Sequence, residues 1–426
     1  EMTAAVFLSG LLGAMLLGMP IAFAVLISAV LLMLFLGEFD PQVVAQNAIG
    51  GADNFVLMAV PFFILAGEFM NAGGLSRRIV DMAMAFVGHL RGGLGYVAIL
   101  AALVLASLSG SAVADTAALG ALLVPMMREA GYNTERACGL IAAGGIIAPV
   151  IPPSIGFLLF GVVANVSITQ LFMAGIVPGA MMAISLVAAW WWVSRRDSFN
   201  PAPRMPWIGR IGVLGRGVWA LMMPVIIIGG LKMGVFTPTE AAVVAAFYAL
   251  FVGVFVYREL NLKSIYHCLL IAARTSAVVL ILVAMAMVAS YMITIADVPG
   301  QIGAWLEPIA DSPGMLVAAM LLIAFGLGMV LDFIPIVLVL TPVFMPIIRA
   351  AGVDPVYFGV VFIMTVAIGM ITPPVGVVLN VIASIGKVSM ERAVRGVLPF
   401  LAAEALIVIL LLLFPAFVTV PAGWWR

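Results

Sequence analysis

The sequence predicts an all-α polytopic membrane protein built from two inverted-topology repeats. The first indication is composition: the 426 residues are 65% hydrophobic and 9% charged, with a mean hydropathy of +1.28, whereas soluble domains carry roughly 25% charged residues. The second is that apolar runs long enough to span a bilayer recur from end to end. The third is that a fixed offset of 221 residues places prolines and glycines of one half on those of the other.

The apolar segments are expected at 4–36, 55–72, 94–127, 137–164, 171–193, 213–231, 238–257, 267–296, 314–348, 356–386 and 397–420. The first of these is either one tilted span or two short spans that meet at "GMP". Segments 94–127 and 314–348 are too long for a simple span. Each contains a polar or glycine-rich interruption, "SLSGS" and "GLGMVLD". We therefore predict that both are re-entrant helical hairpins.

The basic residues favour these hairpins over full crossings. With two hairpins, 15 of the 19 Lys and Arg residues fall in loops on one side and 3 on the other, and Arg274 lies within a span. The positive-inside rule then assigns the 15 to the cytoplasm. A full crossing by 94–127 would separate the arginines of the loop after 171–193 from Arg77, Arg78 and Arg91. Five crossings separate the hairpins, and an odd number inverts the second repeat.

A double proline interrupts an apolar segment in each repeat. Under the offset, Pro152 and Pro153 fall on Pro373 and Pro374, and further matches are Pro125 with Pro346, Arg128 with Arg349, Gly131 with Gly352, Gly175 with Gly396, and Pro178 with Pro399. A proline pair removes two backbone donors and leaves carbonyls without helical partners. In lipid this costs several kcal/mol per group, unless the break lines a polar cavity or binds an ion. The alternative is a plain proline kink. Because each pair follows a hairpin, we expect each hairpin tip to lie against its broken helix near the membrane midplane.

Polar residues gather at the first interruption, in "ASLSGSAVADTAALG". Hydroxyl, carboxylate and loop carbonyl oxygens are suited to an alkali cation, and intramembrane carboxylates are functional candidates by default. We assign a first cation site to Ser109, Gly110, Ser111, Asp115 and Pro152. The alternative for the serines is that their hydroxyls donate back to the backbone of their own helix.

The second repeat offers a second set of oxygen ligands. Ser111 maps onto Asp332, and Thr372 directly precedes the second double proline. We assign a second cation site to Asp332, Thr341, Thr372 and Pro373, and substrate contacts to Ser107, Ser154 and Asn380. Purely structural roles for Thr341, Thr372 and Asn380 remain an open alternative.

Several functional classes are excluded. The net charge of zero predicts no nucleic-acid partner. The chain lacks a P-loop, H-E-x-x-H, a Cys/His metal cluster and G-x-S-x-G. Asp115 and Asp332 lack the G-x-G-D context of an intramembrane aspartyl protease, and we interpret Cys138 and Cys268 as small buried hydrophobes. We expect no enzyme and no cofactor besides a coupling cation. "TPTE", with Glu240, is typical of a helix cap.

The ordered motifs resemble the large membrane subunit of tripartite ATP-independent periplasmic (TRAP) transporters. They are "PFFILAGEFMNAGGLSRRIVD", "SLSGSAVADTAALG", "IIAPVIPPSIG", "GVFTPTEAA", "GMVLDFIPIVLVLTPVFMPI" and "GMITPPVGVVLNVI". The resemblance implies sodium-driven import of organic acids, such as C4-dicarboxylates or sialic acids, across the bacterial inner membrane. It also implies a periplasmic substrate-binding protein, a separate or fused small four-helix membrane subunit, and elevator motion of a transport domain within the bilayer. A stand-alone ion-coupled carboxylate or anion transporter of the same fold is the alternative.

This resemblance also gives the expected domain organisation. We predict scaffold helices in 1–90, a transport-domain repeat in 91–193, a cytoplasmic loop with scaffold helices in 194–312, a second repeat in 313–396, and a C-terminal helix in 397–426. Within the first repeat we expect the hairpin at 91–128, the broken helix at 137–164 and a closing helix after it. Within the second repeat we expect the hairpin at 313–349 and the broken helix at 356–386.

Overall fold

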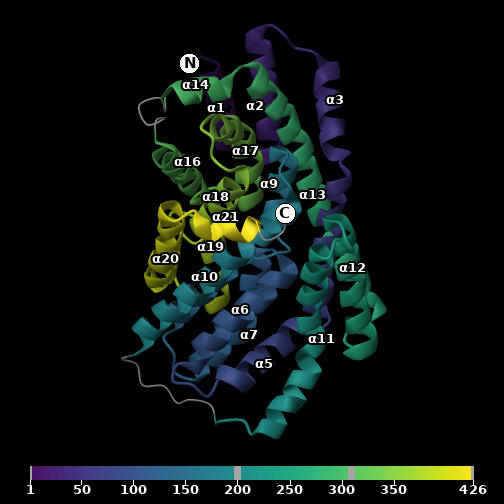
Figure 1. The fold of residues 1–426 in the computed structure, drawn as a ribbon, viewed down its shortest axis with the longest axis vertical. Helices are drawn as coiled ribbons and strands as arrows, with labels where there is room; N and C mark the ends of the chain where they lie inside the picture. The colour runs from purple at the N-terminus through teal and green to yellow at the C-terminus, as the bar shows by residue number, and fades with distance from the viewer. Residues whose placement is uncertain (1, 196–202, 306–311, 424–426) are drawn as a thin grey trace.

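A computed structural model describes residues 2–195, 203–305 and 312–423, and every regular element in these ranges is a helix (Figure 1). Seven of the described helices are long and apolar enough to cross a membrane. The predicted all-α polytopic fold is therefore confirmed. Arg196 and Arg426, which entered the charge count above, lie outside the described residues.

The N-terminal segment forms two short helices, which settles the first open alternative. Here α1 is Met2–Leu16 and α2 is Ile21–Leu36. The chain reverses at "GMP", where Gly18 has a φ of 79°, and the two helices pack on each other.

Two further helices in this region were not predicted, α3 (Pro41–Ala52) and α5 (Leu75–Val87); the 3-10 helix η1 (Phe55–Met58) and α4 (Ala59–Ala72) lie between them. Asp40 caps α3 by accepting a 2.8 Å hydrogen bond from Gln42 N. On α5, Leu75 and Ile79 are buried while Arg77 is exposed. Neither helix is apolar throughout, so a search for apolar runs misses both.

Each repeat consists of five helices in the same order. The first repeat contains α6 (Gly93–Ser109), α7 (Ala112–Glu129), α8 (Thr134–Gly145), α9 (Ile155–Ala164) and α10 (Ile168–Ser194). The second contains α16 (Pro313–Gly328), α17 (Phe333–Ala350), α18 (Pro355–Gly369), α19 (Val377–Gly386) and α20 (Met390–Leu413). Adding the offset of 221 to the bounds of α7 gives those of α17 without any shift. Both predicted hairpins and both broken helices are present.

The C-terminal boundary differs from the prediction. Helix α20 begins at Met390 and crosses the boundary that we placed after residue 396. Because α20 corresponds to α10 under the offset, it closes the second repeat. A separate helix, α21 (Ala416–Gly423), follows the break at Phe414 and Pro415.

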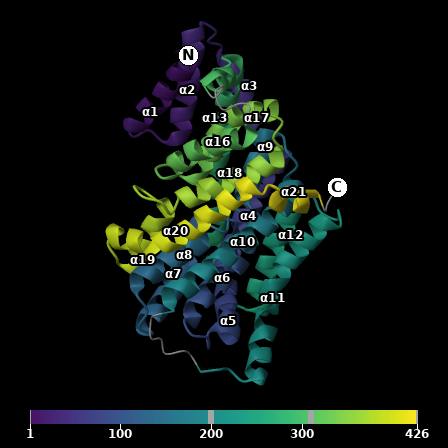
Figure 2. The ribbon, with the colours of Figure 1, turned by 60° about the vertical axis from the view of Figure 1, so that its left-hand side comes forward.

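The segment between the repeats supplies long helices that lie along one side of the molecule. These are α11 (Trp207–Lys232), α12 (Pro238–Phe251) with the π-helix η2 (Val252–Val256), and α13 (Leu262–Ile295). The short helix α14 (Val298–Trp305) follows and packs near α1 and α17. In Figures 1 and 2, α11 and α12 stand beside the repeats, and α13 packs on α2, α3, α4 and α17. The capping box at Thr237 and Glu240 confirms the interpretation of "TPTE".

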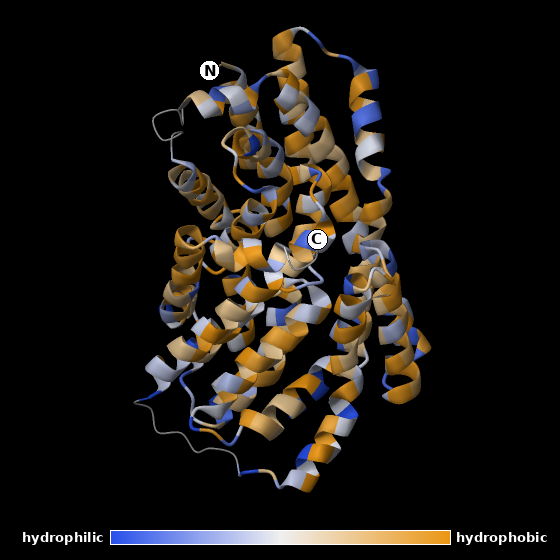
Figure 3. Cartoon of the chain, in the orientation of Figure 1, coloured by the Kyte–Doolittle hydropathy of each residue, from blue (hydrophilic) through white to orange (hydrophobic). Residues whose placement is uncertain are grey.

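Contacts between loops agree with the predicted sidedness. Arg91 donates a 3.0 Å hydrogen bond to Arg195 O, and Arg392 forms a 2.5 Å ion pair with Glu135. Each contact joins loops that the charge count assigns to the cytoplasm. In Figure 3 hydrophobic residues cover most of the helix lengths, and hydrophilic residues recur near the lower ends of α10 and α11. The basic loops therefore gather at one end of the molecule.

Two arginines at equivalent positions bind the repeats to each other. Arg128, at the end of α7, donates a 2.5 Å hydrogen bond to Gly386 O at the end of α19. Arg349, at the end of α17, donates a 2.6 Å hydrogen bond to Ala164 O at the end of α9. A guanidinium at a helix C-terminus satisfies a free carbonyl and favours the helix dipole. Each hairpin therefore caps the broken helix of the other repeat.

We predict that Arg128→Gln and Arg349→Gln each lower the stability of the folded chain by about 1 kcal/mol, because each removes a charge-assisted bond at a helix end. The two losses should add, since the caps lie in separate places. Thermal melting in detergent measures this. Arg395→Gln is the control, since Arg395 pairs with Glu391 one turn away on an exposed helix face and should melt like the parent. Unchanged melting of both cap variants would contradict the capping role.

Sidedness can be tested with a second pair of equivalent positions, Glu129 and Ala350, which are both exposed. In a background without the buried Cys138 and Cys268, an impermeant maleimide should label Ala350→Cys in intact cells. Glu129→Cys should react only after the membrane is permeabilised. Labelling of both positions from the same side would show that the second repeat is not inverted.

Candidate substrate and cation site

The tip of the first hairpin is a single left-handed turn. Helix α6 ends at Ser109, Gly110 has φ 63° and ψ 10°, and Ser111 caps α7 by accepting a 3.4 Å hydrogen bond from Ala114 N. A Cβ atom at Gly110 would lie 2.7 Å from Pro153 O. The tip therefore packs directly on the broken helix, and both its backbone conformation and its close approach require glycine.

The broken helix beneath this tip leaves carbonyl groups free. Between α8 and α9 the chain is non-helical, and the Pro152–Pro153 peptide bond is cis. Ser154 caps α9: its Oγ accepts from Phe157 N at 3.1 Å and donates to Pro149 O at 2.5 Å. Among the described residues, no hydrogen bond reaches the carbonyls of Ile151, Pro152 or Pro153. Free carbonyls thus lie beside the hairpin tip, as the double proline predicted.

The second repeat repeats this arrangement with direct hydrogen bonds. Met329 O, at the tip between α16 and α17, accepts from Val375 N at 3.1 Å and from Gly376 N at 3.2 Å. A Cβ atom at Gly369 would lie 2.7 Å from Gly328 Cα. The Pro373–Pro374 bond is also cis. The predicted contact between each hairpin tip and its own broken helix is therefore confirmed in both repeats.

Two buried oxygen atoms in the first turn of α7 have no hydrogen-bond partner among the described residues. Asp115 is only 2% exposed; its Oδ1 accepts a hydrogen bond from Ser109 Oγ, and its Oδ2 has no partner. Thr116 is fully buried, lies against Gly145 of α8, and its Oγ1 has no partner. Carboxylate and hydroxyl oxygens are ligands that hard cations prefer. The residues at this tip therefore fit a cation. Thr116 was visible in "ADTAALG" but was not among the assigned ligands.

The other predicted hydroxyls donate to backbone carbonyls. Ser107 Oγ bonds to Val104 O at 2.6 Å, and Thr341 Oγ1 and Thr372 Oγ1 bond to carbonyls four residues earlier, at 2.5 and 2.8 Å. Asn380 Nδ2 bonds to Val375 O at 2.6 Å. The hydrogen bonds expected of a structural role are thus present, because these groups donate to backbone carbonyls. Their oxygen lone pairs can still coordinate a cation.

Asp332 occupies the same structural position as its repeat partner. It is exposed and caps α17 by accepting a 2.8 Å hydrogen bond from Phe333 N, as Ser111 caps α7. Thr341 lies nine residues further along α17, which is roughly 13 Å at the rise of an α-helix. The structure therefore does not bring these two members of the assigned second site together.

A cavity of about 270 Å³ adjoins the first hairpin tip. It is lined by Ser109 and Ser111 on the hairpin, and by Glu68 and Asn71 of α4 and Thr275 of α13 opposite. Sequence reasoning missed the three residues on α4 and α13. A signal existed for Glu68, because it is a carboxylate within the apolar run "FFILAGEFMNAGG".

Inverted repeats whose hairpins and broken helices meet beside a polar cavity define the class of secondary transporters. Comparison with known proteins gives the family. The family model "Tripartite ATP-independent periplasmic transporter, DctM component" matches residues 8–417. The chain belongs to this family, as the motifs predicted, and it is a transport subunit rather than an enzyme.

Relatives extend over the whole chain. A TRAP transporter large permease protein of Haemophilus influenzae is 52% identical, and the 2,3-diketo-L-gulonate TRAP transporter large permease protein YiaN of Escherichia coli is 51% identical, each over 99% of this chain and 100% of the relative. The sialic acid TRAP transporter large permease protein SiaM of Vibrio cholerae is 37% identical over 96% of both chains. The YdaH transporter of Alcanivorax borkumensis shares the fold, with a TM-score of 0.61 at 17% identity over 90% of this chain and 88% of its own.

We predict that Gly110→Ala abolishes transport, because a Cβ atom there collides with Pro153 O and separates the tip from the broken helix. Gly131→Ala is a matched control: Gly131 has a φ of 82°, but a Cβ atom at this position would have no neighbour within 4 Å. Both variants carry a backbone strain of about 1–2 kcal/mol. Uptake in proteoliposomes and melting should be measured together. Equal loss of uptake in both variants would show that strain alone, not the tip contact, is responsible.

Proposed function

We propose that this chain is the permease subunit of a sodium-coupled importer of organic acids. The observation that carries this proposal is a pair of buried oxygens, Asp115 Oδ2 and Thr116 Oγ1, which lie at a hairpin tip beside free carbonyls and find no hydrogen-bond partner among the residues that the structure describes. A buried carboxylate with only one of its two oxygens hydrogen-bonded is costly. A bound cation would supply the missing interaction and would draw hairpin and broken helix together.

The first cation site in this proposal comprises Ser109, Gly110, Ser111, Asp115 and Pro152, to which Thr116 is added. The second cation site uses the other tip, with Asp332, Thr372 and Pro373; Thr341 is left out because it lies too far along α17 from Asp332. Its support is the set of carbonyls at the second double proline, since no hydrogen bond between described residues reaches those of Ile371, Pro373 or Pro374. The two sites would therefore differ in the burial of their carboxylate, since Asp115 is buried and Asp332 is exposed.

The substrate in this proposal is a carboxylate that binds in the cavity beside the first tip. The N-termini of α7 and α9, capped by Ser111 and Ser154, carry partial positive charge that favours an anion. Glu68 faces the cavity from the opposite wall and repels a carboxylate, so the substrate group should lie on the hairpin side, next to the cations. The relatives named for 2,3-diketo-L-gulonate and sialic acid transport support a sugar acid.

The motion in this proposal is an elevator. The hairpin tip contacts α4 at a glycine, since a Cβ atom at Gly67 would lie 3.6 Å from Ser109 Cβ. A small residue there lets the tip approach closely and slide along α4. In this scheme the repeats move and α4, α11, α12 and α13 form the scaffold.

The partners in this proposal are a small four-helix membrane subunit and a periplasmic binding protein, with the chain in the bacterial inner membrane. Helix α11 exposes Ile208, Ile211 and Val225 on its surface, and such a face suits a membrane partner or lipid. A stand-alone transporter of the same fold is the alternative, and the uptake assay below separates it.

We predict that Asp115→Asn weakens the apparent sodium affinity roughly ten- to a hundredfold, because a lost contact to a charged group costs about 1.5–3 kcal/mol. Uptake of radiolabelled 2,3-diketo-L-gulonate against sodium concentration measures this in proteoliposomes that contain the small subunit and a saturating binding protein. Asp40→Asn is the control, since Asp40 is an exposed helix cap that asparagine replaces well.

Two outcomes would contradict this function. If Asp115→Asn lost maximal rate while its sodium dependence stayed as in the parent, Asp115 would be structural and the cation site misplaced. If the purified chain alone accumulated free substrate at the full rate without the binding protein, the stand-alone alternative would be correct.

A further inference from the structure

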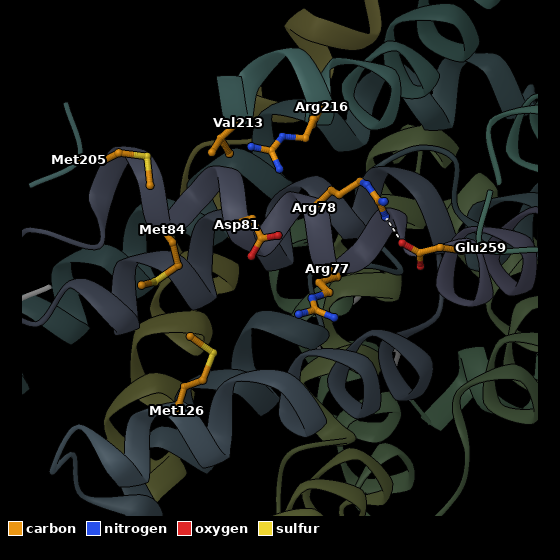
Figure 4. Close-up of a pocket in the computed structure, with 9 residues that line it drawn as sticks. All are labelled: Arg77, Arg78, Asp81, Met84, Met126, Met205, Val213, Arg216 and Glu259. Carbon is orange, nitrogen blue, oxygen red and sulfur yellow. Dashed lines mark ion pairs between the residues drawn. The ribbon is translucent and has the colours of Figure 1, made fainter. Parts of the chain in front are cut away.

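A second cavity lies away from the transport site, on the side that the basic residues assign to the cytoplasm. It has a volume of about 480 Å³ and lies between α5, α7 and α11. Five charged side chains line it: Arg77, Arg78 and Asp81 of α5, Arg216 of α11, and Glu259 after η2. Figure 4 shows these groups around one region of the cavity.

Of the three arginines, Arg78 is already paired with groups of the protein. Arg78 forms a 2.7 Å ion pair with Glu259, and its guanidinium lies 3.8 Å from the centre of the Tyr257 ring. Tyr257 in turn donates a 2.7 Å hydrogen bond to Arg216 O. These contacts fix α5 to α11 and to the end of α12. Arg78 and Glu259 therefore neutralise each other and act as part of the wall.

The other two arginines have no acidic partner among the described residues. Arg77 makes no ion pair there, and Arg216 makes only a 3.4 Å hydrogen bond from Nε to Gly212 O of its own helix. Asp81 faces the same cavity, so two guanidinium groups stand against one carboxylate. Six residues before Arg216, Arg210 is buried, and its Nε and Nη2 have no hydrogen-bond partner in the described part of the chain. This part of α11 therefore carries more positive charge than the described residues neutralise.

The opposite end of the cavity is apolar. Met84 of α5, Met126 of α7 and Met205 before α11 line it, and Figure 4 shows their thioethers on the side away from Arg78 and Glu259. Next to it, α11 exposes Ile211 and Leu214. The cavity thus combines a cationic end with an apolar end at the membrane surface.

We propose that this cavity is an oxyanion site that takes the phosphodiester of an anionic phospholipid, with Arg77 and Arg216 as its ligands. Guanidinium groups bind phosphate in a bidentate manner, and basic pockets between helices at the cytoplasmic surface suit anionic headgroups. The methionine end accommodates the start of an acyl chain, because thioether side chains adapt to irregular apolar shapes. A free phosphate or carboxylate would use only the cationic end, and so the apolar end favours lipid as the source.

This site would hold α5 and α11 against the cytoplasmic end of the first hairpin, where Met126 lies three residues before the end of α7. The experiment measures melting of the purified transporter in detergent during titration with dioleoylphosphatidylglycerol, with dioleoylphosphatidylcholine, or with inorganic phosphate. The anionic dioleoylphosphatidylglycerol should raise the melting temperature of the parent in proportion to its binding. The zwitterionic dioleoylphosphatidylcholine should not. Arg77→Gln and Arg216→Gln should each need roughly ten- to a hundredfold more of the anionic lipid for the same shift.

Arg395→Gln is the matched control, because Arg395 is an exposed arginine on the same side of the membrane and outside the cavity; its titration should match the parent. Equal titrations in all three variants and the parent would overturn the site. Stabilisation by millimolar inorganic phosphate equal to that by the lipid would overturn the lipid as its source. If Arg77→Gln fails to fold, Arg216→Gln alone decides the outcome. The Arg216 side chain is exposed and forms no ion pair with another described residue, so its replacement should not prevent folding.

Discussion

The requirement that backbone hydrogen bonds be satisfied away from water governs this structure. Both hairpins and both broken helices interrupt apolar segments, and each interruption exposes polar backbone groups. The protein solves this by placing the interruptions against one another: Met329 O accepts two amides from the second broken helix, and Gly110 lies against Pro153 O. The carbonyls that stay free then line the region where a cation or substrate can satisfy them. The candidate site thus consists of the backbone carbonyls that form no hydrogen bond within the protein, together with the side chains beside them.

Two sets of contacts hold the repeats in place, one within each repeat and one between them. Within each repeat, the tip contacts its own broken helix; between repeats, Arg128 and Arg349 cap the half-helices of the opposite repeat. The first set determines the local geometry of the site. The second joins each hairpin, at its end away from the tip, to a half-helix of the opposite repeat.

Features that depend on special backbone residues could be predicted from the sequence. Prolines and glycines identify the hairpins, the broken helices and the repeat, because their roles follow from their own conformational limits. Features that depend on how helices pack could not. Glu68 and Thr275 come to the first tip only through the placement of α4 and α13, and the distance of Thr341 from Asp332 follows from an uninterrupted α17. Helices α3 and α5 were not predicted because they are not apolar throughout.

The crossed arginine caps also bear on how such a chain could arise. A single five-helix unit would carry an arginine at the end of its hairpin and an uncapped half-helix, with neither satisfied internally. Two copies of that unit, inserted in opposite orientations, would satisfy both, each by the other. The crossed caps therefore require both copies in opposite orientations, and a linker with an odd number of crossings provides this within one chain. The segment from α11 to α13 lies between the two copies and forms that linker.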